Sequence, residues 1–163
     1  MREITGNLWD YHAGTPTRER LELVSESYKE KGWLVITTNG TIKRNGNAVM
    51  GRGVAYQAAN RFPKLPLELG EKLIEGNLVY SFPKYLLLTM PVKHHWAYQA
   101  DPNLIVESAV QLAKLFPSGL DTCIYMPRPG CGNGGLLWKD VKPLIKDILN
   151  DNFCVVEISK NKE

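Results

Sequence analysis

Apolar and β-branched residues gather in five short stretches of the chain, each bounded by glycine, proline or polar residues. The stretches cover residues 33–38, 78–82, 85–90, 122–126 and 154–158. Valine, isoleucine and aromatic side chains fit the pleated, half-buried surface of a sheet. The pattern therefore predicts five strands spread over most of the chain.

Between these strands, apolar residues recur at steps of three and four, which is typical of a helix that packs one face on a sheet. One predicted helix opens at Thr15-Pro16 and stops at Gly32, a second opens in the same way at Asp101-Pro102, and a third covers residues 137–149. Their inward faces are Leu21, Val24 and Tyr28; Ile105, Ala109, Leu112 and Phe116; and Val141, Leu144, Ile145 and Ile148.

Alternation of strand and helix predicts an α/β fold, a three-layer α/β/α sandwich with a central mixed sheet, in which ligands bind beyond the carboxyl ends of central strands. A chain of 163 residues fits one domain, so we expect a single domain over residues 1–163. The Pro-Lys-Leu-Pro run at residues 63–66 is predicted to be a rigid connection between two helices and not a domain boundary.

Composition narrows the functional classes. With 44% hydrophobic and 23% charged residues the chain is an ordinary globular protein, and a net charge of +3 permits a phosphate-bearing ligand without implying a strongly basic nucleic-acid surface. No apolar run approaches the ~20 residues of a membrane span, and the first residues lack a signal-peptide pattern. We expect a soluble, cytoplasmic protein with no membrane contact.

The cysteines and histidines show neither a disulfide framework nor a metal motif. They are Cys123, Cys131, Cys154, His12, His94 and His95. No two cysteines form a CxxC pair, and no pair of these residues has the spacing of zinc ligands. We expect no metal and no cofactor.

The first segment with chemical content is a strand that ends in Asn39, followed by Met-Gly-Arg-Gly-Val-Ala at residues 50–55, where a glycine pair opens a helix. Glycines let the backbone approach a ligand closely, and free N–H groups at a helix start favour phosphate. It is not a dinucleotide fingerprint, because Tyr56 occupies the third glycine position. A tight turn without a ligand is the alternative for Gly51 and Gly53.

The second segment repeats the order of strand, glycine-rich loop and helix over residues 126–138. Four of its six residues from 130 to 135 are glycine. Such a loop is favoured where successive backbone N–H groups form a concave nest around an anion. Two loops of this kind at two strand ends indicate one extended diphosphate ligand.

A third segment brings a lysine to the same rim. The strand before it leaves the sheet at Pro91, and Lys93 follows two residues later. The alternative is that Lys93 is an ordinary solvated residue, with His94 and His95 in a polar loop anchored by Trp96.

Together these segments resemble macrodomains. The resemblance is carried by Gly-Asn-Leu-Trp at residues 6–9, Met-Gly-Arg-Gly-Val-Ala at 50–55 and Pro-Arg-Pro-Gly-Cys-Gly-Asn-Gly-Gly-Leu-Leu-Trp at 127–138, and it covers nearly the whole chain. The branch it resembles most contains terminal ADP-ribose glycohydrolases and antitoxin-type enzymes that remove ADP-ribose from DNA. In that branch a Pro-Thr-Lys-Arg-His-Trp run is similar to residues 91–96 here.

The resemblance implies a role for each segment. Lys93 acts on the distal sugar and Asn39 orients that ribose, while residues 51–54 wrap the distal ribose and diphosphate and residues 130–135 grip the diphosphate. The full set implied to bind the ligand is Asn7, Leu8, Gly51, Arg52, Gly53, Val54, Pro127, Gly130, Cys131, Gly132, Asn133, Gly134, Gly135 and Leu136.

Two positions depart from the family pattern. Many macrodomains have an aspartate at the position of Asn7, where a carboxylate accepts a hydrogen from the adenine amino group; the Asn7 amide oxygen accepts a weaker, neutral hydrogen bond. At Gly134 the protein-directed glycohydrolases of the branch carry an aspartate that assists the lysine, whereas the DNA-directed members are similar to this chain in having glycine.

The function implied is hydrolysis of an ADP-ribosyl bond by a monomer whose partner is ADP-ribose or an ADP-ribosylated DNA or protein. Lysine could attack the anomeric carbon or stabilise the leaving group, and the sequence leaves both open. Residues 53–57 and 61–64 also resemble macrodomain phosphatases that act on ADP-ribose 1″-phosphate. A reader that binds ADP-ribose without cleaving it is the non-enzymatic alternative.

Overall fold

The protein is described here by a computed structural model in which residues 1–14 and 31–158 are placed; the predicted helix that opens at Thr15-Pro16 lies outside these residues. One six-stranded sheet has the order β1-β6-β5-β2-β4-β3. Its strands are β1 (Arg2–Gly6), β2 (Trp33–Thr38), β3 (Tyr80–Phe82), β4 (Leu87–Pro91), β5 (Ile124–Pro127) and β6 (Phe153–Ile158). All neighbouring strands are parallel except β3, which runs antiparallel to β4.

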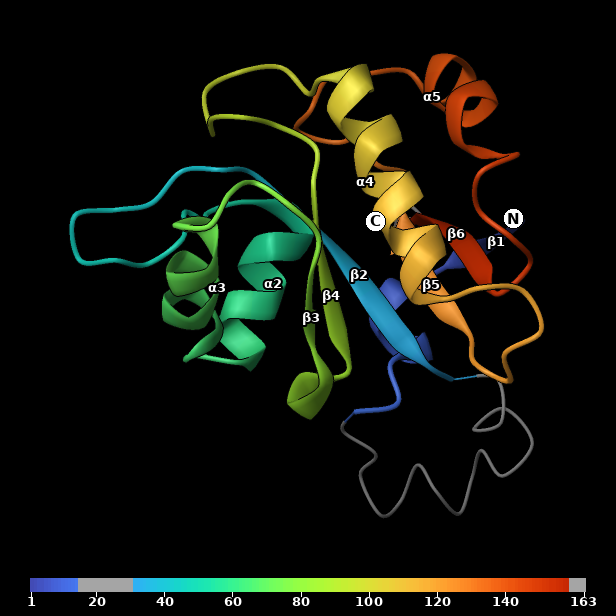
Figure 1. Ribbon diagram of the computed structural model, residues 1–163, viewed down its shortest axis with the longest axis horizontal. Helices are drawn as coiled ribbons and strands as arrows, with labels where there is room; N and C mark the ends of the chain where they lie inside the picture. The colour runs from blue at the N-terminus through green and yellow to red at the C-terminus, as the bar shows by residue number, and fades with distance from the viewer. Residues whose placement is uncertain (15–30, 159–163) are drawn as a thin grey trace, which may run out of the picture.

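Helices cover both faces of this sheet (Figure 1). The helices are α2 (Gly53–Arg61), α3 (Leu65–Leu73), α4 (Pro102–Leu115) and α5 (Trp138–Ile145), with 3-10 turns η1 (Leu8–Tyr11) and η3 (Pro83–Tyr85). Along β2, Leu34 and Ile36 pack with α2, α3 and η1, whereas Val35 packs with α4 and α5. This alternation follows from the two-residue period of a strand and confirms the predicted α/β/α sandwich.

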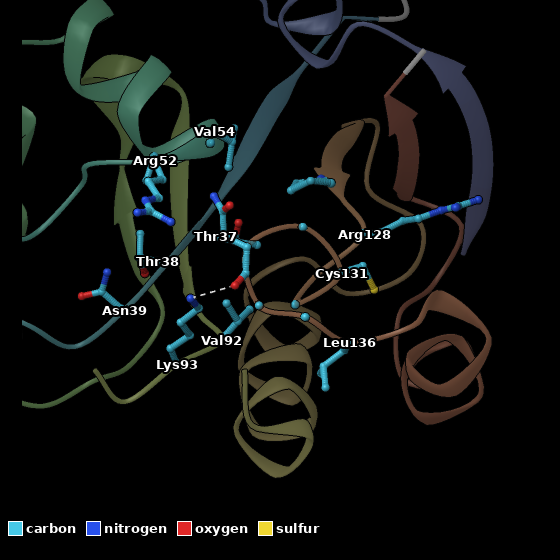
Figure 2. Close-up of a pocket in the computed structure, with 18 of the residues that line it drawn as sticks. Thr37, Thr38, Asn39, Arg52, Val54, Val92, Lys93, Arg128, Cys131 and Leu136 are labelled. Atoms are coloured by element: carbon cyan, nitrogen blue, oxygen red, sulfur yellow. Dashed lines mark hydrogen bonds between the residues drawn. The ribbon is translucent and has the colours of Figure 1, made fainter. Parts of the chain in front are cut away.

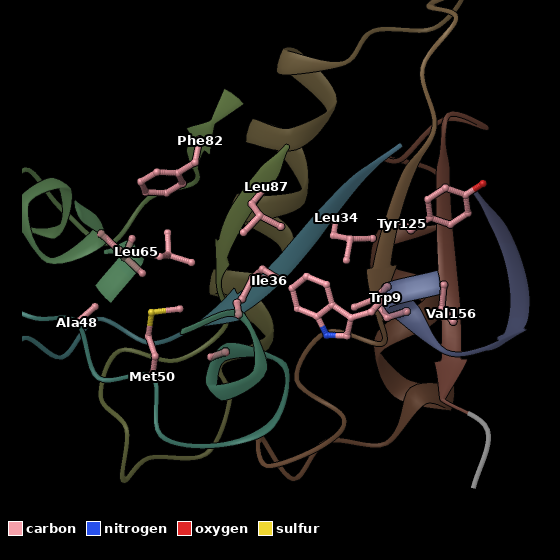
Figure 3. Close-up of a cluster of buried hydrophobic side chains, with 14 of the residues drawn as sticks. Trp9, Leu34, Ile36, Ala48, Met50, Leu65, Phe82, Leu87, Tyr125 and Val156 are labelled. Atoms are coloured by element: carbon pink, nitrogen blue, oxygen red, sulfur yellow. The ribbon is translucent and has the colours of Figure 1, made fainter. Parts of the chain in front are cut away.

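The core consists of two apolar clusters, one on each face of the sheet. Figure 3 shows the first, in which Trp9 and Ile36 lie between the sheet and α2. Every residue of β4 and β5 is buried, as expected for central strands covered on both faces. None of the helices in residues 1–14 and 31–158 is long and apolar enough to cross a membrane.

Several predicted boundaries need correction. Strand β1 was not predicted, because it lies at the sheet edge and Ile4 is its one apolar residue. Pro66 lies in the first turn of α3, where a missing N–H costs nothing, so only residues 62–64 connect α2 to α3. Helix α5 ends at Ile145 and not at residue 149, and Leu144 is 42% exposed, so its predicted inward orientation is wrong.

One buried ionisable group makes stability depend on pH. His12 is 6% exposed, and its Nε2 lies 2.8 Å from the Tyr85 carbonyl oxygen. Burial lowers the pKa of the His12 imidazole below its ordinary value. The unfolded chain therefore binds more protons once the pH falls below about 6.5, and the folded state loses stability.

We expect the free energy of unfolding to fall by up to about 1 kcal/mol between pH 6.5 and 5.5 through His12 alone. Urea unfolding of the wild type and of His12→Gln at both pH values measures this, because the difference between the two proteins isolates the imidazole. An identical pH dependence in both proteins would show that His12 does not titrate in this range.

Candidate functional site

A cleft of about 900 Å³ opens at the carboxyl edge of the sheet, a volume within the range of small-molecule sites. Figure 2 shows three chain segments converging on it: the end of β2 with the start of α2, the loop after β4, and the glycine-rich loop after β5. The cleft thus lies where a parallel sheet is expected to bind a ligand.

Strand register explains why residues far apart in sequence meet here. Thr38 pairs with Pro91, so Asn39 and the loop that starts at Val92 leave the sheet at the same level. Strand β5 ends at Pro127 beside β2. The predicted site segments are therefore brought to one edge by the parallel pairing of β2, β4 and β5.

The glycine-rich loop after β5 is shaped as an anion nest. Its turns are closed by hydrogen bonds from the Gly135 N–H to the Gly132 oxygen (3.1 Å) and from the Leu136 N–H to the Gly130 oxygen (2.9 Å). Within the described part of the chain, the N–H groups of Gly132, Asn133 and Gly134 donate to no protein acceptor. Three successive free donors beside the cleft suit a phosphate oxygen.

The glycines of this loop are there for different reasons. A Cβ at Gly132 would meet nothing within 4 Å, so this glycine leaves open space in the cleft. A Cβ at Gly134 would come within 2.5 Å of the Gly130 carbonyl oxygen and 2.8 Å of the Ala100 Cβ. The surrounding atoms therefore leave no room for a side chain at residue 134, and an aspartate at this position does not fit the present loop.

The start of α2 forms the opposite wall. Gly53 has a φ of +60°, a conformation that disfavours any other residue, and a Cβ there would lie 3.3 Å from the Asn133 side-chain nitrogen. The N–H groups of the first helical turn have no partner inside the helix and point their positive dipole end toward the cleft. Arg52 precedes them and also lines the cleft. Both walls therefore offer donors to one ligand.

Lys93 lies in the loop after β4 and reaches the glycine-rich loop with its side chain. Its Nζ donates a hydrogen bond to the Asn133 carbonyl oxygen at 3.1 Å, drawn as a dashed line in Figure 2. The Asn77 amide donates to the Lys93 carbonyl oxygen at 2.8 Å and so holds the backbone of the loop. Lys93 forms no ion pair with any carboxylate of the described residues. Its charge therefore remains available to a ligand.

Cys131 is the one thiol that lines the cleft, among the described residues. Burial raises the pKa of this thiol, and its Sγ donates to the Pro129 carbonyl oxygen at 3.5 Å. The thiolate is the nucleophilic form of cysteine, so the neutral, hydrogen-bonded thiol is poorly suited to attack. Cys131 is therefore a poor candidate for the nucleophile in the cleft.

Of the sixteen predicted site residues, fourteen line the cleft and two do not. The Asn7 oxygen accepts the Trp9 N–H at 3.1 Å as the N-cap of η1, and Leu8 is buried beneath it at 3% exposure. Both still lie near one end of the cleft, because Gly6 pairs with Ile158, a cleft residue.

Asn39 lines the cleft, but its amide already has two partners. Its Nδ2 donates to the Val49 carbonyl oxygen at 3.1 Å, and its Oδ1 accepts the Thr41 N–H at 2.9 Å. An amide nitrogen carries two hydrogens, so one donor remains for a ligand. The Asn39 side chain therefore holds its loop in place and still has one N–H that could bind a ribose hydroxyl, as the predicted role requires.

Sequence reasoning missed other residues of the lining. They include Thr37, Thr38, Trp96, Tyr98, Gln99, Arg128, Trp138, Glu157 and Ile158. Arg128 pairs with Glu157 at 3.2 Å, and Figure 2 shows it extending away from Lys93 toward β1. Their position in the chain could have identified them. Each of these residues lies near the end of a strand or in a segment that was already predicted to face the ligand.

Comparison with known proteins identifies the fold. The macrodomain of Thermus aquaticus DarG superposes with a TM-score of 0.66 at 25% identity, covering 98% of this chain and 97% of that one. The chain has the macrodomain fold. Thermosipho africanus DarTG in complex with ADP-ribose has the same fold over 80% of this macrodomain and 38% of that chain, with a TM-score of 0.60 at 22% identity.

Comparison with sequence relatives agrees with this structural match. It is 31% identical over 116 residues to a DNA ADP-ribosyl glycohydrolase of Thermus aquaticus, covering 64% of the chain. It is 26% identical over 105 residues to one of Mycobacterium tuberculosis, covering 58% of the chain. The matched regions are 32% and 30% of those proteins, so the macrodomain spans about a third of their length. No family model matches the chain.

Proposed function

We propose that this macrodomain binds ADP-ribose in the cleft and hydrolyses the bond between the distal ribose and a DNA base. The observation that carries the proposal is the contact of Lys93 Nζ with the Asn133 carbonyl oxygen, 3.1 Å away. It places the amine directly beside the nest of free N–H groups. A diphosphate held in that nest would bring its distal ribose to the lysine.

Ligand binding rests on backbone groups from both walls. The nest at Gly132, Asn133 and Gly134 faces the first turn of α2, and Gly53 lies close to the Asn133 side chain. Hydrogen bonds from N–H groups to a charged oxygen are shorter and about twice as strong as neutral ones. The adenine end then extends toward Arg128, Glu157 and Ile158, which line the far end of the cleft.

Hydrolysis adds water across the bond between the anomeric carbon and the base. The carbon gains the water oxygen, and the base leaves with a proton. Lys93 acts at that carbon, either by attacking it as the free amine or by stabilising the leaving atom as the ammonium. Both roles require the amine at the sugar end of the cleft. The hydrogen bond from Asn77 to the Lys93 carbonyl oxygen supports this placement, because it holds the backbone from which the lysine side chain extends. Positioning of this kind supplies much of an enzyme's rate advantage.

DNA is favoured over a protein carboxylate as the attachment point. An aspartate that assists the lysine cannot be accommodated at residue 134, since its side chain would collide with the Gly130 carbonyl oxygen. The relatives of this macrodomain are DNA ADP-ribosyl glycohydrolases by name. We also infer that it acts as a monomer, because residues of one chain complete the cleft. We infer that it acts inside the cell, because the relatives are named for an activity on DNA.

We expect ADP-ribose to raise the melting temperature and AMP to do so less, because ligand that binds only the folded state stabilises it by mass action. At a ligand concentration of 100 times Kd the stabilisation is about 2.7 kcal/mol. ADP-ribosylated DNA should then release free ADP-ribose, measured by chromatography. If ADP-ribose shifts neither melting nor the amide signals of Gly132 and Gly134, the binding proposal fails. Binding without release from any substrate would make the protein a reader.

A further inference from the structure

Three aromatic rings gather on the surface of the loop that joins β4 to α4. They belong to His95, Trp96 and Tyr98, and we call them the aromatic platform. The His95 ring centroid is 5.0 Å from that of Tyr98 and 5.7 Å from that of Trp96. Trp96 is 54% exposed and Tyr98 is 63% exposed. Single exposed aromatics are common, but here the partly buried His95 ring lies between two exposed rings, so the three form one aromatic surface.

The platform is held rigidly by its backbone. The Trp96 N–H donates to the Thr41 hydroxyl and the Ala97 N–H to His95 Nδ1, each at 3.1 Å. At the base of the loop, the Asp101 N–H donates to the Val92 carbonyl oxygen at 2.9 Å. A surface that is ordered before binding loses little conformational entropy when a ligand docks.

Position links the platform to the proposed chemistry. Trp96 and Tyr98 line the cleft, and His95 follows Lys93 by two residues. The platform therefore lies on the side of the cleft where the bond to the distal ribose would be cut. A group attached to that ribose can therefore leave the cleft across these rings.

The loop that anchors the platform carries two cations. Thr41, which anchors Trp96, belongs to a loop that carries Lys43 and Arg44, and both side chains are exposed and unpaired within the described residues. The carboxylate hydrogen-bonded to the platform loop is that of Asp101, which is paired with His94 at 2.8 Å and caps α4. Aromatic rings beside cations suit a polyanion with flat apolar groups.

We propose that the aromatic platform stacks an unpaired base of single-stranded DNA next to the ADP-ribosylated base. This inference rests on the proposed function and deepens it, because it makes the strand and not only the modified nucleotide the substrate. Bases stack on aromatic side chains without regard to sequence, since every base has a π face. Lys43 and Arg44 would hold the neighbouring phosphates.

The test compares two substrates that carry ADP-ribose on the same base: a single nucleoside, and a single strand of about ten nucleotides, long enough to cover a site of this kind. We expect Trp96→Ala to lower kcat/KM for the strand about tenfold, the effect of losing one stacked base. The kcat/KM for the nucleoside and the affinity for ADP-ribose should fall by a clearly smaller factor than the activity on the strand, although Trp96 also lines the cleft. Trp96→Phe should retain most of the activity on the strand. Tyr56→Ala is the matched control, because Tyr56 is 52% exposed but does not line the cleft.

A second measurement separates failure of the platform from failure of hydrolysis. Fluorescence anisotropy of a labelled, unmodified strand reports binding without turnover, and we expect the affinity to fall in Trp96→Ala and with rising salt. If no substrate is cleaved but the strand binds more weakly to Trp96→Ala than to the wild type, the proposed hydrolysis is wrong and the proposed stacking on the platform is supported. Equal loss on nucleoside and strand would overturn the platform by showing that Trp96 serves the cleft itself. Strand activity and strand affinity both unchanged in Trp96→Ala would also overturn it.

Discussion

Gly132→Val should weaken ADP-ribose binding at least on the order of 100-fold while the protein remains folded. A Cβ at this position meets nothing within 4 Å, so the new side chain enters open space in the cleft and not the core. Valine there would block the free N–H groups of Asn133 and Gly134. Hydrogen bonds to a charged group contribute about 1.5–3 kcal/mol each, so losing two is sufficient for this effect.

Isothermal titration with ADP-ribose measures the affinity, and melting without ligand tests the fold. Ser118→Val is the matched control, since Ser118 is exposed in a loop at the opposite, amino end of β5. We expect both variants to melt within a few degrees of the wild type. An affinity within twofold of the wild type in Gly132→Val would show that the glycine-rich loop is a structural turn and not the diphosphate site.

Lys93→Ala should lower kcat on ADP-ribosylated DNA by about 10²- to 10⁴-fold, the range typical of a group that transfers a proton or charge in the transition state. ADP-ribose affinity should change little, because in the proposed binding mode backbone N–H groups hold the diphosphate and Lys93 lies at the sugar end. Such a split between rate and affinity is the signature of an interaction made mainly in the transition state.

Single-turnover release of ADP-ribose, with Lys114→Ala as a control for the loss of an exposed lysine on α4, measures the effect. Activity of Lys93→Ala within threefold of the wild type would remove the lysine from the mechanism. If the variant still released phosphate from ADP-ribose 1″-phosphate, the cleft would be a phosphatase site. Cleavage of DNA-linked ADP-ribose should also be faster than cleavage of the glutamate-linked form, and the reverse order would contradict the role assigned to Gly134.

Much of the architecture could be predicted because its signals are local. The β-branched run of β2 gave its bounds, Trp33–Thr38, without error. The Asp101-Pro102 pair marked the start of α4, where the Asp101 side chain does accept the Asn103 N–H at 2.9 Å. These features depend on neighbours within one turn, and a single sequence contains them in full.

Features that depend on tertiary packing could not be predicted. β1 has a polar sequence and becomes a strand because β6 offers it a parallel edge. Leu8 follows a motif residue and looked like part of the ligand site, yet the 3-10 turn η1 buries it. The sequence left open a polar loop anchored by Trp96, and only the fold shows that this ring stays exposed.

The packing at Gly134 also limits which substitutions the loop after β5 can accept. Its Ala100 neighbour accepts no extra atom, and the Ala100 N–H is hydrogen-bonded to the Gly134 carbonyl oxygen at 3.0 Å. Changing the one codon to place a carboxylate there would push the Gly130 backbone away and deform the diphosphate nest at the same time. A shift of substrate toward carboxylate-linked ADP-ribose would therefore require the loop after β5 and the start of α4 to change together. Under the proposed function, a single substitution at residue 134 would therefore weaken diphosphate binding before it could help to cleave another substrate.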